Sequence, residues 1–502
     1  MNANLYSLFE AHFGETPDEP FAMMPGGPVI HYDQLAELSA RYANVLRSMG
    51  CEPGDRVAVQ TDKRWQVIAL YLGALRAGCV YLPLNTGYQR SELSYFFEDA
   101  EPRVIVCRPE AEGVITRLAR GANVLTLGAT GGSLDERAAD APDRFDTVTS
   151  APDDVAAILY TSGTTGRSKG AMLTHRNLGS NALTLVREWG FVRGDVLLHA
   201  LPVYHVHGLF VAVHCVLLAG ARMLWLRKFD AAQVIPLLPR ITVMMGVPTF
   251  YTRLLSEPSF TRDVCRNARL FVSGSAPLLP ETFSEFEART GHRILERYGM
   301  TETGMNTSNP LDGPRIPGTV GKPLPGVDLR IVDEEGRACA AGTVGAIEVK
   351  GPNVFAGYWR MPEKTREEFT ADGYFRTGDM GMLTPEHHVQ IVGRAKDLII
   401  SGGLNVYPKE IEERIDAMDG VVESAVVGVP DPDFGEAVTA VVVARAGHTL
   451  TETAIIASLK AEIAAFKVPK RVHFVDELPR NAMGKVQKNV LRARYSTDDE
   501  AG

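Results

Sequence analysis

The amino-terminal part of the chain alternates between amphipathic and fully apolar segments. Apolar residues recur at helical spacing between residues 32 and 49, at Leu35, Leu38, Tyr42, Leu46 and Met49. Gly50 follows, so the pattern predicts a helix that ends there. An apolar run at 56–60, a helical pattern at 65–78 and a second apolar run at 80–85 come next. Short apolar runs between helices are typical of buried parallel strands.

The same alternation continues downstream and predicts an α/β fold. Further strands are expected at 155–160, 196–201, 243–247, 270–273 and 294–298. The predicted fold class is a large N-terminal domain of mixed, mostly parallel sheets flanked by helices. The longest apolar stretch, 209–226, is interrupted by His214 and Arg222, so we expect a buried helix or strand there and no membrane partner.

Two further units are predicted towards the C-terminus. Shorter strands and Gly-rich turns at about 328–394 indicate a small β subdomain of the large domain, which would span 1–394. Residues 395–502 are expected to form a small, mobile α+β domain. Its predicted elements are a helix at 408–418, strands at 423–429 and 437–443, and a second helix. Thr449 and Glu452 have the spacing of a capping box at the start of that second helix.

Composition and charge exclude several classes of protein. The 502 residues are 45% hydrophobic and 23% charged, as in globular proteins, and the net charge of −9 disfavours a nucleic-acid partner. The six cysteines lack CxxC spacing and lie mostly in apolar runs, so neither disulfides nor zinc are expected. The first residues lack the pattern of a secretory signal, and we expect a cytoplasmic protein.

A loop rich in Gly, Ser and Thr follows the apolar run that ends at Tyr160. It reads TSGTTGRSKG and offers backbone N–H groups, hydroxyls and one cation to an anion, which predicts a polyphosphate ligand. It is not a Walker A loop, because no Gly-Lys-Ser/Thr closes it. A solvated turn is the alternative. The residues expected to hold phosphate are Thr161, Ser162, Gly163, Thr164, Thr165, Gly166 and Lys169.

This loop resembles the signature of the adenylate-forming superfamily, which contains acyl-CoA synthetases, firefly-type luciferases and peptide-synthetase adenylation domains. Further motifs of that superfamily follow in order over nearly the whole chain: PVYHVHG at 202–208, YGMTE at 298–302, YFRTGD at 374–379, GRAKD at 393–397 and NAMGK at 481–485. The resemblance implies that the protein makes an acyl-adenylate from an acid and ATP and then transfers the acyl group to coenzyme A.

The chemistry of adenylation explains the first group of residues. A carboxylate and the α-phosphate of ATP repel each other, so the site needs cations and oriented donors. The resemblance assigns this work to Lys485, on the mobile domain, and to Thr301. Glu302 resembles the carboxylate that coordinates Mg²⁺, with Thr161 as a second metal ligand. A solvated Lys485 and a surface Glu302 are the alternatives.

The resemblance also predicts the nucleotide and coenzyme A sites. Asp379 and Arg394 would contact the ribose, although a structural salt bridge would also explain each of them. Tyr298 would flank the adenine or be a core tyrosine. Lys396 matches the hinge and Gly402 and Gly403 the loop that enters for thiolation, or a structural turn. The other nucleotide-binding residues expected are Ser275, Ala276, Pro277, Glu296, Arg297, Gly299 and Met300.

Two histidines and one arginine point to the acid substrate. His205 resembles the gate between the acyl pocket and the thiol channel, and His207 is expected to line the pocket; a zinc site lacks further ligands. The family commonly has a small residue before the tyrosine of its YGMTE-like motif, whereas this chain has Arg297. A buried guanidinium needs a counter-charge, which a second carboxylate of the substrate would supply. Pairing with Glu296 or another protein acid is the alternative.

The segments ERYGMTE and VSGSAPL closely resemble malonyl-CoA synthetases, so we expect malonate, with methylmalonate tolerated, bound by Arg297, His207 and Ser273. ATP, Mg²⁺ and coenzyme A would be the cofactors. Ligases for oxalate, fatty or aromatic acids, and a non-catalytic nucleotide-binding protein, remain the rivals. Monomer and homodimer are left open, and a lysine acetyltransferase acting on Lys485 is a candidate partner.

Overall fold

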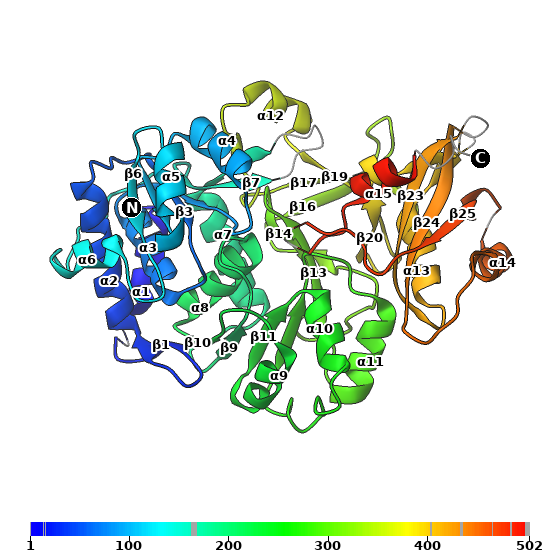
Figure 1. Cartoon of the computed structure of the whole chain (residues 1–502), viewed down its shortest axis with the longest axis horizontal. Helices are drawn as coiled ribbons and strands as arrows, with labels where there is room; N and C mark the ends of the chain where they lie inside the picture. The colour runs from blue at the N-terminus through cyan, green and yellow to red at the C-terminus, as the bar shows by residue number, and fades with distance from the viewer. Residues whose placement is uncertain are drawn as a thin grey trace. The chain divides into compact units, whose positions relative to one another are not determined.

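Short apolar segments form the strands of several sheets in a computed structural model of the chain (Figure 1). The structure describes residues 2–13, 15, 17–161, 168–401, 404–431, 435–463, 465–481 and 484–496. Contacts divide the chain into two units. Unit 1 contains Met1–Asp328 and Val349–Phe375, and unit 2 contains Leu329–Glu348 and Arg376–Gly502.

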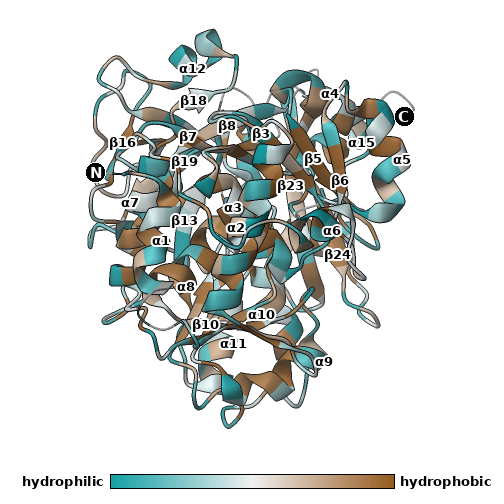
Figure 2. Cartoon of the chain, turned by 90° about the vertical axis from the view of Figure 1, so that its left-hand side faces the viewer, coloured by the Kyte–Doolittle hydropathy of each residue, from teal (hydrophilic) through white to brown (hydrophobic). Residues whose placement is uncertain are grey.

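One sheet of unit 1 has seven strands in the order β18-β8-β7-β4-β3-β5-β6. Its strands are β3 (Arg56–Gln60), β4 (Val80–Pro83), β5 (Val104–Cys107), β6 (Asn123–Thr126), β7 (Val155–Thr161), β8 (Lys169–Thr174) and β18 (Gly357–Tyr358). Strands β6, β5, β3, β4 and β7 are parallel, whereas β8 runs antiparallel to β7 and β18 to β8. The strands β3 and β5 are buried nearly throughout, as their apolar sequences predict (Figure 2).

The second sheet of unit 1 has nine strands in the order β15-β14-β13-β12-β11-β9-β10-β1-β2. They are β1 (Pro20–Met23), β2 (Val29–His31), β9 (Val196–His199), β10 (Arg222–Trp225), β11 (Val243–Gly246), β12 (Leu270–Ser273), β13 (Leu295–Met300), β14 (Gly304–Ser308) and β15 (Lys322–Pro323). Its central strands are parallel, and β14 folds back on β13. The carboxyl ends of the parallel strands therefore meet at one edge, where ligands bind in such sheets.

Helices connect these strands. They are α1 (Leu5–Phe13), α2 (Tyr32–Ser48), α3 (Trp65–Arg76), α4 (Arg90–Ala100), α5 (Glu112–Leu118), α6 (Ser133–Ala139), α7 (His175–Glu188), α8 (His214–Ala219), α9 (Ala231–Val234), α10 (Pro248–Leu255), α11 (Pro280–Thr290) and α12 (Pro362–Glu368). Helix α2 ends where the sequence predicts, because Gly50 takes the positive φ of 75° that terminates it. Among the described residues, no helix is both long enough and apolar enough to cross a bilayer.

Unit 2 contains antiparallel strands and three α-helices. A four-stranded sheet, largely in this unit, has the order β16-β17-β19-β20: β16 (Asp328–Val332), β17 (Gly345–Lys350), β19 (Phe375–Leu383) and β20 (Val389–Arg394). The other sheet contains β21 (Ile399–Ser401), β22 (Leu404–Val406), β23 (Val421–Asp431), β24 (Gly435–Ala444) and β25 (Arg471–Phe474). The helices are α13 (Pro408–Asp416), α14 (Glu452–Glu462) and α15 (Lys488–Tyr495).

The α/β fold class is confirmed, with one local correction. Helix α14 does not begin with the capping box expected at Thr449. Its N-cap is Thr451, whose hydroxyl accepts a hydrogen bond from the amide of Ala454. Glu452 accepts instead from the amide of Val472 in β25, because that strand passes beside the start of the helix. The predicted domain boundary at 394/395 stays a prediction, since contacts group the four-stranded sheet mainly with unit 2.

Candidate functional site

The three residues predicted to bind the substrate lie together at the carboxyl edge of the nine-stranded sheet. Ser273 is the last residue of β12, and Arg297 lies in the neighbouring parallel strand β13. His207 begins a π-helical segment, His207–Val213, after β9. Arg297 is close enough to His207 to perturb it electrostatically, and Nδ1 of His207 is hydrogen-bonded to Oγ of Ser275 at 3.3 Å. Extra residues of the π type are frequent at functional sites.

Several polar atoms of this site are buried and have no hydrogen-bond partner among the described residues. Arg297 is 3% exposed, and among the described residues neither its Nε nor one of its terminal nitrogens, Nη2, has a hydrogen-bond partner. The same holds for Oγ of Ser273 and Nε2 of His207, in residues that are 0% and 2% exposed. Each unpaired buried polar group costs free energy, more so when it is charged. A ligand that accepts hydrogen bonds would explain all of them.

Burial sets the protonation of the site. It lowers the pKa of Arg297 to about 10, against the opposing effect of Tyr251 and Glu296, so the guanidinium is still a cation at neutral pH. Burial, with the nearby charges of Arg297 and His205, holds the pKa of His207 well below its ordinary value. The site therefore presents one fixed positive charge beside a neutral imidazole.

Glu296 acts on this charge electrostatically, but its Oε1 is engaged elsewhere. Its Oε1 accepts a hydrogen bond from the amide of Leu278 at 3.0 Å. Successive side chains of a strand point to opposite faces, so Glu296 and Arg297 are turned away from each other along β13. The alternative in which Arg297 pairs with Glu296 is therefore disfavoured.

The turn after β12 brings the backbone against the guanidinium. A Cβ atom on Gly274 would lie 2.4 Å from Cζ of Arg297, so a side chain there would displace the guanidinium. Ser275 has a φ of +71°, a strained conformation for a residue with a side chain. Ala276 and Pro277 follow and are exposed, which leaves them accessible to a nucleotide.

The motif predicted to flank the adenine lies where β13 turns into β14. Tyr298 is 8% exposed, and Gly299 and Met300 are partly exposed. A Cβ atom on Gly299 would lie 2.0 Å from the carbonyl oxygen of Gly304, so a side chain there would break the turn. Thr301, partly exposed, follows in the same turn.

Glu302 lies beside Thr161, at the end of β7. Glu302 is 6% exposed, and its Oε1 accepts hydrogen bonds from Oγ1 of Thr161 at 3.3 Å and from the hydroxyl of Tyr358 at 3.1 Å. Both donors are neutral hydroxyls, and neither brings a positive charge to the carboxylate. A carboxylate and a hydroxyl are hard oxygen ligands, which suits Mg²⁺. This pair therefore fits the predicted metal site.

Lys169 lies at the end of the predicted phosphate loop. It is 7% exposed, and its Nζ is 3.3 Å from Oε1 of Glu368 and 4.2 Å from the centre of the Tyr358 ring. Ser162, Gly163, Thr164, Thr165 and Gly166, which the sequence also assigned to phosphate, lie outside the described residues, as do Gly402 and Gly403.

The remaining predicted residues other than His205 belong to unit 2. Asp379 in β19 and Arg394 in β20 are directly paired, and Nε of Arg394 lies 2.8 Å from Oδ1 of Asp379. The salt bridge that the sequence left open is thus present, and it leaves the proposed ribose contacts untested. Lys396 is exposed in the 3₁₀ turn Ala395–Asp397.

Lys485 is exposed on a turn of unit 2. Its amide donates to Oδ1 of Asn481, and the amide of Asn481 donates to the carbonyl of Lys485. Gly484 has a φ of +77° in this turn. In unit 1, His205 is partly exposed and its Nδ1 accepts from the amide of His207 at 3.3 Å.

Sequence reasoning missed Tyr358 and Glu368. Tyr358 reaches Glu302 because the two-residue strand β18 pairs with β8, and so short a strand leaves no periodic signal. Glu368 lies in a segment of mixed charges that reads as a solvated helix face. The one local signal was the Gly-Tyr-Trp sequence, in which a glycine precedes two aromatic residues.

Comparisons with known proteins agree with this geometry. Residues 9–359 match the family model "AMP-binding enzyme", and residues 410–485 match "AMP-binding enzyme C-terminal domain". A crystal structure of ATP-bound MatB from Rhodopseudomonas palustris is 56% identical, with a TM-score of 0.96 and 99% of each chain covered.

Two relatives of known activity are more distant. A mitochondrial malonate–CoA ligase of Mus musculus is 38% identical over 92% of this chain and 86% of its own. A sulfoacetate–CoA ligase of Cupriavidus necator is 35% identical over 96% of each chain. Because the family model matches more than half of the chain and its C-terminal domain follows in the expected order, the chain belongs to the AMP-binding enzyme family.

Proposed function

We propose that the protein is an ATP-dependent malonate–CoA ligase, which forms malonyl-CoA through a malonyl-adenylate and releases AMP and pyrophosphate. The observation that carries the choice of acid is Arg297, a buried cation whose Nε and Nη2 have no partner among the described residues. Malonate has one carboxylate to activate and a second to meet this cation. Ligases for malonate and for sulfoacetate among the relatives support a substrate with two anionic groups.

A monocarboxylic acid fits this site poorly. An apolar acyl chain would leave the guanidinium, Oγ of Ser273 and Nε2 of His207 unpaired in a dry site, and it would bury a charge without compensation. Sites built to bond a polar group reject analogues that lack it far more strongly than apolar sites reject a change of size. Fatty and aromatic acids are therefore disfavoured.

The proposed chemistry assigns a role to each group. Arg297, with Ser273 and the neutral His207 as further donors, holds the distal carboxylate and fixes the orientation of the other. Glu302 and Thr161 would hold Mg²⁺, which neutralises charge on the phosphate oxygens of ATP. Thr301 and Lys485 would stabilise the charge that develops at the α-phosphate. Exchange of pyrophosphate for coenzyme A then requires a second geometry, for which Lys396 is the proposed hinge.

A substrate panel tests the proposal. We expect ATP-dependent pyrophosphate release with malonate, a weaker response to methylmalonate, and little response to acetate, butyrate, oxalate or benzoate. Sulfoacetate is included because it keeps two negative charges at similar spacing. Preference for a monocarboxylic acid would contradict the proposal, and absence of pyrophosphate release with every acid would favour a non-catalytic nucleotide-binding protein.

An Arg297→Met variant separates binding from folding. Loss of a buried charged contact costs about 2–5 kcal/mol, so kcat/KM for malonate should fall by about 30-fold or more. The free energy of unfolding without ligand should stay equal or rise, because the variant removes an uncompensated buried charge. The control is Arg269→Met, which breaks the 2.6 Å ion pair to buried Asp195 and should destabilise the protein. An Arg297→Met enzyme with unchanged malonate kinetics would refute the assignment.

Two further proposals concern the cell. A cytoplasmic protein would keep its cysteines reduced, and all six are free thiols. Lys485 is exposed, which leaves it open to a lysine acetyltransferase; acetylation would remove the charge that we assign to adenylation.

A further inference from the structure

Tyr358 is a buried tyrosine whose hydroxyl reaches the candidate metal carboxylate. It is 4% exposed, and its hydroxyl donates to Oε1 of Glu302 at 3.1 Å. Thr161 donates to the same oxygen at 3.3 Å. Since both hydroxyls meet on Oε1, Oε2 is the oxygen left to take a cation. The amide of Phe355 also donates to the carbonyl of Glu302 at 2.7 Å, so the segment before Tyr358 holds the backbone of the same residue.

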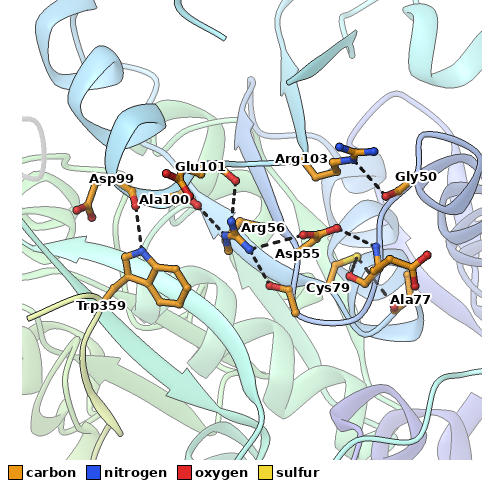
Figure 3. A network of polar contacts seen from close by, with 12 residues as sticks. Gly50, Asp55, Arg56, Ala77, Cys79, Asp99, Ala100, Glu101, Arg103 and Trp359 are labelled. Carbon is orange, nitrogen blue, oxygen red and sulfur yellow. Dashed lines mark hydrogen bonds and ion pairs between the residues drawn. The ribbon is translucent and has the colours of Figure 1, made fainter. Parts of the chain in front are cut away.

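The segment that carries Tyr358 is anchored on both sides of it. Tyr358 pairs with Ala171 of β8, and the amide of Trp359 donates to the carbonyl of Gly170 at 2.7 Å. The indole of Trp359 donates to the carbonyl of Asp99 at 3.0 Å, at the end of α4 (Figure 3). A side chain fixed at its backbone and at its neighbour loses little further entropy when it orients a partner.

Arg56 completes this anchor. Figure 3 shows its guanidinium bonded to the carbonyls of Ala100, at 2.6 Å, and Glu101, at 2.8 Å, and its Cζ lies 5.4 Å from the centre of the Trp359 ring. The guanidinium thus satisfies the last carbonyls of α4 and covers the indole. The end of α4 and β18 are therefore fixed to the same sheet.

The ring of Tyr358 has a second contact that its hydroxyl does not need. Nζ of Lys169 lies 4.2 Å from the ring centre and pairs with Glu368, which also pairs with Lys364 at 3.2 Å. Phenylalanine would keep this ring contact and lose only the hydroxyl. The two functions of Tyr358 can therefore be separated by one substitution.

We propose that Tyr358 is a positioning residue that holds the carboxylate of Glu302 in the orientation in which it binds the divalent cation that accompanies ATP. This rests on the proposed function only in so far as the protein binds a metal–nucleotide complex. Partners that orient a metal ligand typically change metal affinity by 10–100-fold when they are removed. A neutral phenol bonded to one oxygen belongs at the lower end of this range.

The test measures nucleotide binding by isothermal titration calorimetry with the full chain and α,β-methylene-ATP, with and without Mg²⁺. For the wild type, Mg²⁺ should strengthen binding. In Tyr358→Phe this gain should shrink about tenfold, whereas the affinity without metal stays unchanged. The KM for Mg²⁺ in pyrophosphate exchange should rise in parallel, with the KM for malonate unchanged.

The matched control is Tyr42→Phe. The hydroxyl of Tyr42, in α2, also donates to a partly buried carboxylate of the same unit, Oδ1 of Asp135 in α6, at 2.5 Å. It should alter thermal stability without altering the gain from Mg²⁺. A Tyr358→Phe protein that keeps the full gain, or loses affinity equally with and without metal, would overturn the proposal.

Glu302→Gln separates this proposal from the proposed function. It should abolish the gain from Mg²⁺; if it does so while Tyr358→Phe does not, the metal site stands and the role of Tyr358 falls. A gain that survives in Glu302→Gln would place the metal elsewhere and overturn both assignments.

Discussion

Several side chains of unit 1 are buried and either lack their usual charge or have polar atoms without a hydrogen-bond partner among the described residues. Arg297 keeps its charge although its Nε and Nη2 lack a hydrogen-bond partner among the described residues, and His207 is held neutral beside it. His175 is neutral for a structural reason, because burial lowers its pKa to about 4 and its Nδ1 accepts the amide of Leu5 at 3.0 Å. Arg297 and His207, with their unpaired polar atoms, point to a ligand, whereas His175, whose ring nitrogen is bonded within the protein, points to a role in stability.

At this scale we predict an acid-sensitive contribution of His175. Its folded pKa is depressed, so the unfolded chain binds more protons below the ordinary pKa of about 6.5, and stability falls as the pH drops from there towards 4. Between pH 7.5 and 5 the loss should be about 2 kcal/mol. Urea titrations should show that His175→Asn, whose amide oxygen can accept from Leu5, lacks this part of the loss. Equal pH dependence in both proteins would contradict the assignment, and the exposed His387→Asn is the control.

At the scale of the element, the site depends on β12 and β13 lying side by side. Their parallel pairing sets Ser273 opposite Glu296, so the side chain of the next residue, Arg297, points to the other face of the sheet, where it acts electrostatically on His207. The turn after β12 then passes close to the guanidinium at Gly274, where a side chain would displace it. The site thus depends on strand register as much as on side chains.

Gly274→Ala tests that dependence. The added Cβ would lie 2.4 Å from both Cζ and Nη1 of Arg297, so the guanidinium must shift. A lost charged hydrogen bond is worth about 1.5–3 kcal/mol, which should raise the KM for malonate roughly 10- to 100-fold with little change in the KM for ATP. Steady-state kinetics measure both. Gly194→Ala, where a Cβ would meet nothing within 4 Å, should leave both unchanged; a matching loss there would argue against a local effect.

Strands buried on both faces could be predicted from the sequence, whereas elements whose position depends on contacts with distant segments could not. The expected strands at 56–60, 243–247 and 270–273 are present as β3, β11 and β12, because parallel strands between helices are continuously apolar. Strand β18 escaped prediction because two residues have no periodicity. The start of α14 was misplaced because Thr449 and Thr451 offer equivalent caps, and only the passage of β25 decides between them.

The candidate site shows the same division. Arg297 could be singled out from sequence because its type is unusual at that place in the motif, and the structure adds that Oε1 of Glu296 accepts from the amide of Leu278. The roles of Tyr358 and Gly274 could not be predicted, since each depends on a contact with a residue distant in the chain. The roles assigned to Lys485, Asp379 and Lys396 stay predictions.

At the scale of the whole molecule, the proposed chemistry draws on both units. The groups proposed to bind malonate and Mg²⁺ belong to unit 1, and Lys485 belongs to unit 2. The first half-reaction needs a cation at the α-phosphate, whereas the second needs access for a thiol. One chain can catalyse both half-reactions only if a group that is required for adenylation is dispensable for thiolation.

Lys485→Ala should therefore affect the two half-reactions unequally. Loss of a transition-state donor should slow malonate-dependent ATP–pyrophosphate exchange by about 10²–10³-fold. Thiolation of chemically prepared malonyl-adenylate, measured as the formation of malonyl-CoA, should proceed at the wild-type rate. Lys460→Ala, an exposed lysine of α14, is the control. An equal fall in both half-reactions would rule out this division of labour.

The unmatched cation at Arg297 has a consequence for the lifetime of the protein. The free-energy cost of desolvating this guanidinium is incurred when the chain folds, before the acid binds. The enzyme without substrate is therefore less stable, and its own substrate offsets that cost on binding. Any ligand that binds only the native state shifts the folding equilibrium towards it. The cellular abundance of the protein would then follow the malonate supply, because molecules without bound malonate unfold more often and are degraded sooner.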